Sequence, residues 1–196
     1  MTWEDSSVSA LGLSPVEWVA VEDFKHRVWA LRASIQHYLL LQREQIASLS
    51  SIQPGSAGHT WNQQKLHSQA DSQIEALLNN ANNLRRALKS KNLPASMRGQ
   101  TLGNMDESIR HVRNIREHWD ENRQFWSEGT PIPSGKYESA RWFKTHFPDK
   151  TPWSSSWSNV DGPIVCGIIH LDDLLVIVDQ LEGSIPDQST LIGSGG

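Results

Sequence analysis

The sequence predicts a mainly α-helical protein: an antiparallel bundle of about four to five helices with a small β-hairpin inserted before the last helix. Two long stretches carry apolar residues at intervals of three and four, turn-forming residues at 51–58 separate them, and a β-branched run at 164–169 precedes a final helical segment. No break in composition divides the 196 residues into two cores. We therefore expect one helical-bundle domain at residues 15–186, with an arm at 1–14 and a flexible tail at 187–196.

The first helix begins at a capping box. Ser14 can cap the helix, Pro15 suits its first turn, and Glu17 stands three residues after the serine. Apolar residues then recur at helical spacing to about residue 49, with no internal Gly or Pro. The residues of this apolar face are Val21, Phe24, Val28, Leu31, Ile35, Tyr38, Leu39 and Ile46.

Two further helices follow the loop at 51–58. The second keeps a helical period over residues 61–88 until a proline ends it, and it should pair antiparallel with the first. The third begins at Asn104 or Asp106 and runs as one helix to about Ser127. Its apolar stripe should pack on the first two helices and consists of Met105, Ile109, Val112, Ile115, Trp119 and Trp126.

Residues 130–170 differ in character and read as an insertion rich in Gly, Pro, Ser and Trp. A helix-like patch at 136–147 is closed by a proline. A small β-hairpin follows, with its turn at 159–162 and its second strand in the β-branched run. The last helix opens at Asp172 or Asp173 and ends at a glycine.

Composition limits the classes of function. The net charge of -4 gives no overall attraction to nucleic acid, so RNA binding would need a local basic patch. The single cysteine, Cys166, allows no intrachain disulfide, fits a reducing, cytoplasmic compartment, and is expected to be a small buried hydrophobe. The first residues lack a secretory signal, and charges interrupt the apolar stretch at 162–178, so we expect no membrane association. The nine tryptophans are expected to act as wedges between packed helices.

The residues best suited to chemistry are Arg113, Asn114 and His118, which fall within six positions in the middle of the third predicted helix. An imidazole titrates near neutral pH and can transfer protons, while a guanidinium offers a planar fork of donors to phosphate oxygens. The pattern resembles that of the HEPN superfamily, in which an Arg is followed after four to six residues by a His, often with Asn, Asp or His directly after the Arg. The resemblance implies a metal-independent endoribonuclease without a cofactor, acting as a toxin or antiviral-defence effector, with a homodimer forming the active site and a cognate regulatory protein as a possible partner.

Each residue of the motif has a chemical role in this hypothesis. His118 would take the proton of a 2'-OH as that oxygen attacks the phosphate, and Arg113 would hold the charge that builds on the phosphoryl oxygens. Asn114 would orient the imidazole or a phosphate, and the products would be a 2',3'-cyclic phosphate and a 5'-OH end. On a straight helix a five-residue step places Arg113 about 140° from His118, so the site is expected to combine two protomers.

Three alternatives stay open at this level. Arg113 with Glu117, and Arg116 with Asp120, can be ordinary ion pairs on a solvated helix face. The bundle would then be an inactive HEPN-like module that binds a partner protein or a nucleotide, or a plain assembly module with a tryptophan-rich interface. A metal site is also conceivable, with ligands drawn from His111, His118 and either Glu107 or Glu121.

Basic residues that could bind RNA gather at the end of the second predicted helix. Arg85, Arg86 and Lys89 form this cluster together with Lys91 and Arg98. They serve equally well to complement the negative end of that helix's dipole. A further phosphate contact is expected from Arg110, because it lies on the same helical stripe as the catalytic motif.

Overall fold

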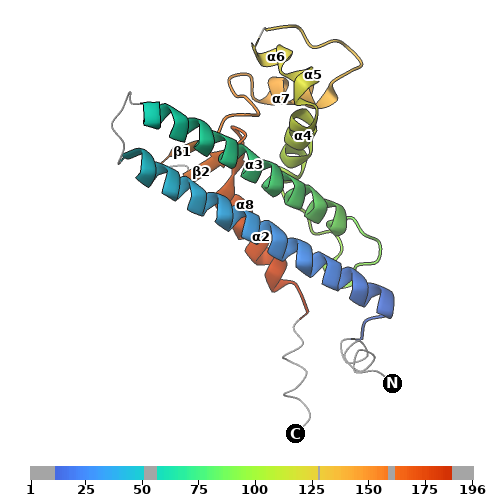
Figure 1. The fold of residues 1–196 in the computed structure, drawn as a ribbon. Helices are drawn as coiled ribbons and strands as arrows, with labels where there is room; N and C mark the ends of the chain where they lie inside the picture. Colours follow the sequence, from blue (N-terminus) through green and yellow to red (C-terminus); the bar gives the residue numbers. More distant parts are fainter. Residues whose placement is uncertain (1–11, 51–56, 128, 159–161, 187–196) are drawn as a thin grey trace.

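The computed structural model describes residues 12–50, 57–127, 129–158 and 162–186 and confirms the predicted mainly helical class. Helix α2 (Pro15–Ser50) and helix α3 (Ala57–Leu88) form a long antiparallel pair that spans the molecule (Figure 1). The predicted tail at 187–196, and the predicted arm at 1–14 up to residue 11, lie outside the described residues.

The capping box at the start of α2 is formed as predicted. The backbone N–H of Ser14 donates to Glu17 Oε2 at 3.0 Å, and the Ser14 hydroxyl donates to the same oxygen at 2.8 Å. In return, the backbone N–H of Glu17 donates to Ser14 Oγ at 3.3 Å. These bonds satisfy N–H groups that the first turn of a helix leaves without partners, and they fix where α2 begins.

The core lies where the long pair meets two shorter helices, α4 (Met105–Glu117) and α8 (Leu171–Gly183). Helix α8 packs along α2, and α4 leans away from α3 at a steep angle (Figure 1). The periodic apolar residues of each helix point into this core, where the side chains of Phe24, Leu31, Leu77, Ile109 and Leu174 are fully buried. The helical spacing of the sequence therefore identified most of the buried positions, whereas Ile46, predicted on the apolar face of the first helix, is 53 % exposed.

The predicted single helix to Ser127 is wrong, because the chain breaks at His118. Helix α4 ends at Glu117, and two short helices follow, α5 (Trp119–Asn122) and α6 (Gln124–Ser127). His118 has φ -114° and ψ 42°, outside the helical region. The amide of Asn122 bonds carbonyl oxygens at the break: its Nδ2 donates to that of His118 at 2.8 Å, which also accepts the backbone N–H of Asn122 at 3.0 Å, and to that of Ile115 at 3.4 Å. This buried amide stabilises the break.

The tryptophan side chains are less buried than the sequence predicts, in part because of this break. Trp119, expected in the apolar stripe, is 50 % exposed, whereas Trp126 is half-buried and packs against the core. Trp142 and Trp153 are likewise half-buried, and they come from the insertion. Of the described tryptophan side chains, none is fully buried between the two long helices, so the wedge interpretation fails for that pair.

The insertion holds one helix and a small sheet. Helix α7 (Glu138–His146) forms within the helix-like patch predicted at 136–147. Outside the insertion, a short 3-10 turn, η1 (Ala95–Met97), precedes α4. The predicted hairpin is present as strands β1 (Ser156–Ser158) and β2 (Gly162–Val165), and a third strand, β3 (Ile169–His170), extends the antiparallel sheet in the order β1-β2-β3. The sheet leads directly into α8.

The turn between β2 and β3 requires glycine. Cys166 and Gly167 both have positive φ, at 54° and 71°. A Cβ atom on Gly167 would stand 2.9 Å from Ser154 Oγ and 3.0 Å from the carbonyl oxygen of Thr151, closer than such atoms pack. This close approach fixes residues 151–154 against the sheet.

Candidate functional site

Two of the three motif residues line a common pocket. Asn114, on α4, and His118, at the helix break, open onto a cavity of about 580 Å³ between α4, α5 and the start of α7. Because His118 lies beyond the last turn of α4, its side chain is exposed instead of packing along the helix. The remaining lining residues are Glu121, Asn122, Lys136, Tyr137, Glu138, Ser139 and Ala140. We call this cavity the motif pocket.

The third motif residue, Arg113, does not line the motif pocket. Its Nη1 lies 2.6 Å from Glu117 Oε2, and its Nη2 donates to Glu117 Oε1 at 2.9 Å. Its Nε donates to Asn79 Oδ1 on α3 at 3.3 Å. The ion pair with Glu117 is the one that the helix spacing predicts. Within one chain, therefore, the predicted charge-stabilising group and the predicted base serve different surfaces.

The second predicted ion pair, between Arg116 and Asp120, is wrong. Arg116 is only 8 % exposed and reaches α3, where its Nε lies 2.6 Å from Glu75 Oε1 and its Nη2 lies 3.5 Å from Asp71 Oδ1. Its Nη1 also donates to the carbonyl oxygen of Pro152 at 3.3 Å. Arg116 thus ties α4 to α3 and to the insertion, which is a structural role.

A buried histidine stands behind the motif pocket, and the sequence reasoning did not assign it this role. The His111 side chain is 1 % exposed and stacks on Trp142 with ring centroids 4.3 Å apart. Its Nε2 lies 2.7 Å from Arg110 Nη2, and its Nδ1 lies 3.1 Å from Ser139 Oγ. A guanidinium can only donate, so Nε2 accepts, and Nδ1 carries the hydrogen that is donated to Ser139. Burial, and then the charge of Arg110, lower the pKa of His111.

Ser139 is held from two sides and lines the motif pocket. Its Oγ accepts from His111 Nδ1 and from Asn114 Nδ2, the latter at 3.4 Å. With both lone pairs engaged, the hydroxyl hydrogen of Ser139 is free to donate to another acceptor. Neither partner could be found from sequence spacing, because Ser139 lies 25 residues after Asn114 on another helix.

The structure does not form the alternative metal site, with ligands from His111, His118 and either Glu107 or Glu121. Across the described ranges, no three His, Cys, Asp or Glu residues gather closely enough to hold an ion. His111 uses both ring nitrogens on Arg110 and Ser139, so it offers no lone pair to a metal shared with His118. Cys166 is buried as expected, and burial raises the pKa of its thiol to about 12, which makes it a poor nucleophile.

The predicted basic cluster lies at the other end of α4 from the motif pocket. Arg85 Nη1 and Lys89 Nζ approach Asp106 Oδ2 at 3.5 and 3.4 Å, while Arg86 is exposed. Asp106 and His118 are twelve residues apart, which corresponds to about 18 Å along a helix. Arg110 is held by Glu107 at 2.6 Å and approaches Glu138 at 3.5 Å. The structure thus brings Arg110 near the pocket but leaves the cluster separate.

The site belongs to a helical bundle, with an exposed histidine and hydrogen-bond donors around one cavity. In comparisons with known proteins, no family model, curated protein or solved structure matches this chain. None of the helices in the described parts of the chain has the length and apolar character needed to cross a membrane.

Proposed function

We propose that this protein is a metal-independent endoribonuclease of HEPN type that works in the cytoplasm, with the motif pocket as half of a site completed by a second protomer. The observation that carries the proposal is the placement of His118. It is exposed at the end of α4 in a cavity shared with Asn114 and Ser139. A base beside two hydrogen-bond donors is the arrangement that phosphodiester transfer to a neighbouring hydroxyl needs.

The reaction follows from these groups. His118 takes the proton of the 2'-OH, the 2'-oxygen bonds to phosphorus, and the bond from phosphorus to the 5'-oxygen breaks. The leaving 5'-oxygen takes a proton from water, and the imidazolium of His118 returns its proton to the hydroxide that remains, which gives a 2',3'-cyclic phosphate and a 5'-OH end. Asn114, Ser139 and Lys136 donate to the nonbridging phosphate oxygens, where charge builds up.

Arg113 supports a shared site because it faces away from its own pocket. Two copies related by a two-fold axis would each offer the face of Arg113 to the motif pocket of the other. The guanidinium keeps further N–H groups while it contacts Glu117, since it carries five donors in a planar fork. Arg113 can therefore bind a phosphate held in the motif pocket of the partner subunit while its ion pair with Glu117 stays formed.

The test is cleavage of RNA in the presence of EDTA. Wild type should cut single-stranded RNA and leave cyclic phosphate ends, whereas His118→Ala should be slower by about a hundredfold or more, the usual contribution of a positioned proton-transfer group. His37→Ala removes an exposed histidine from α2 and is the matched control, with activity unchanged. Activity lost only on chelation, or equal in His118→Ala and wild type, would contradict the proposal.

A second candidate is a catalytically inactive module that binds a partner protein or a nucleotide. The forked contact of Arg113 with its own Glu117 favours it. The two carboxylates of the motif pocket, Glu121 and Glu138, repel phosphate and favour the partner protein over the nucleotide. Expression in cells distinguishes the two candidate functions. A toxin or antiviral-defence nuclease, restrained by a cognate regulatory protein, should arrest growth when expressed alone, and His118→Ala should not. An inactive module should arrest growth in neither form.

A further inference from the structure

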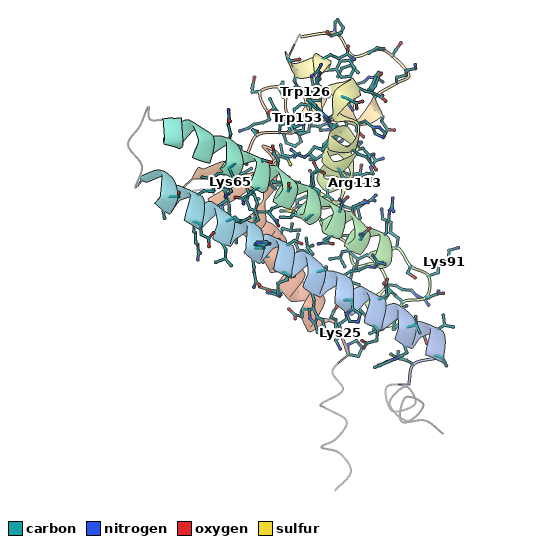
Figure 2. All side chains as sticks on the ribbon, in the orientation of Figure 1. Lys25, Lys65, Lys91, Arg113, Trp126 and Trp153 are labelled. Carbon is teal, nitrogen blue, oxygen red and sulfur yellow. The ribbon has the colours of Figure 1, made fainter. Side chains whose placement is uncertain are left out.

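A second pocket, of about 670 Å³, lies on the other side of α5 from the motif pocket. Its lining residues come from α5, α6 and the segment before β1 and are Trp119, Arg123, Trp126, Ser127, Thr151 and Trp153. Figure 2 shows Trp126 and Trp153 next to each other at this end of the molecule, and their rings meet edge to face at 5.1 Å. We call this cavity the tryptophan pocket.

Positive charge accompanies the aromatic rings. The guanidinium of Arg123 lies 5.3 Å from the ring centre of Trp119, and Lys144 Nζ lies 5.4 Å from that of Trp126. No carboxylate is found among the described residues that line the pocket, in contrast to the motif pocket. The surface therefore suits an anionic ligand with a flat ring, and it does not suit an aliphatic chain or a cation.

One buried donor also lacks an acceptor. The indole N–H of Trp126 is buried and has no hydrogen-bond partner among the residues that the structure describes. A buried donor left without an acceptor destabilises a folded protein. The carbonyl oxygens and ring nitrogens of nucleobases are acceptors of the kind that this indole lacks.

We propose that the tryptophan pocket binds a base of single-stranded RNA, stacked on Trp119, with the adjoining phosphate held by Arg123 and Lys144. Aromatic side chains beside cations are how proteins hold single-stranded nucleic acids. The inference rests on the proposed function, because Trp119 directly follows His118 in the chain. A base in this pocket belongs to a nucleotide close to the phosphodiester bond that the motif pocket would cut.

The test measures binding apart from cleavage. A short RNA with 2'-O-methyl groups cannot be cut, because it lacks the attacking hydroxyl, and it is titrated while tryptophan fluorescence is followed. Trp119→Ala should weaken binding about tenfold, whereas Trp119→Phe should keep most of it. Trp119 is exposed, so its loss should leave the fold intact, as circular dichroism will show. Trp29→Ala, at an exposed tryptophan on α2, is the matched control and should bind like wild type.

An abasic oligonucleotide of the same length identifies what the pocket recognises. It should bind weakly, and Trp119→Ala should not weaken it further. Equal affinity of Trp119→Ala and wild type for the intact RNA overturns the inference. So does a dimer of wild type that becomes a monomer in Trp119→Ala by sedimentation, since the pocket would then be a protein interface.

The proposed function and the base site can fail separately. If wild type cleaves RNA and Trp119→Ala cleaves it with unchanged KM, the base site is wrong and the nuclease stands. If wild type binds the methylated RNA through Trp119 but never cleaves natural RNA, the nuclease is wrong and the base site stands. A rise in KM with little change in kcat supports both.

Discussion

At the scale of the residue, the neutral His111 connects the protein's interior to its candidate site. It is wedged between Arg110, which donates to one ring nitrogen, and Ser139, which accepts from the other. A second proton at Nε2 would face the Arg110 guanidinium in a buried place, and burial and that charge lower the pKa of His111 by more than the carboxylates of Glu107, 3.3 Å from Nε2, and Glu138 raise it. A second proton would go to Nε2 and leave the Nδ1 donor in place, so His111 can hold Ser139 in either charge state.

This lowered pKa makes stability depend on pH. Unfolded chains bind a proton on this histidine near the ordinary pKa of 6.5, whereas the folded protein resists it. The free energy of unfolding should therefore fall as pH decreases through 6.5, and the loss should level off once the pH passes below the folded-state pKa. Urea denaturation at a series of pH values measures this, and His111→Gln should remove part of the dependence. His37→Gln should not; if both variants behave alike, His111 is not the source.

At the scale of the element, the break between α4 and α5 positions His118. In a continuous helix the Ile115 carbonyl oxygen would accept from the backbone N–H of residue 119, whereas at the break the Asn122 amide donates to it at 3.4 Å. Periodicity and helix-breaking residues could not predict the break, because apolar spacing continues across it and residues 113–127 contain neither Gly nor Pro. The signal that could have been found is Asn122 itself, a short amide that bonds backbone carbonyls four and seven residues earlier.

Removing that amide should therefore damage both stability and activity. Asn122→Ala removes the side-chain donor from the Ile115 and His118 carbonyl oxygens, of which the second keeps the backbone N–H of residue 122, and we expect a loss of about 1 to 2 kcal/mol in the free energy of unfolding. RNA cleavage should fall as well, because the imidazole loses its fixed position. Chemical denaturation and initial rates measure the two effects. Asn92→Ala, at an exposed turn, is the control and should change neither stability nor activity. An Asn122→Ala protein as stable as wild type would show that the break does not depend on the Asn122 amide.

At the scale of the whole molecule, sequence patterns predicted the elements that depend on nearby residues and missed the contacts between helices that are far apart in the chain. The two long helices, the capping box and the small hairpin followed from periodicity and turn chemistry. The partners of Arg116 and Asn114 did not, since Glu75 and Ser139 come from other helices far along the chain. Periodicity says which face of a helix is buried but not which helix covers it.

The proposed dimer makes a quantitative prediction at this scale. Arg113→Ala and His118→Ala should each be inactive alone, yet mixing them in equal amounts should restore about one quarter of wild-type activity. Half of the dimers are then mixed, and each mixed dimer has one intact site. The measurement is the cleavage rate after subunit exchange, with total protein held constant. A mixture as inactive as its parts would mean that one chain supplies the whole site.

The buried Cys166 has a practical consequence for such experiments. Its thiol is buried in the turn between β2 and β3 and resists ionisation, so maleimide reagents should leave the native protein unlabelled. A cysteine introduced at an exposed position such as Lys65 would then carry the only dye on each chain. Energy transfer between donor-labelled and acceptor-labelled chains can thus report assembly directly, with the native protein as the blank.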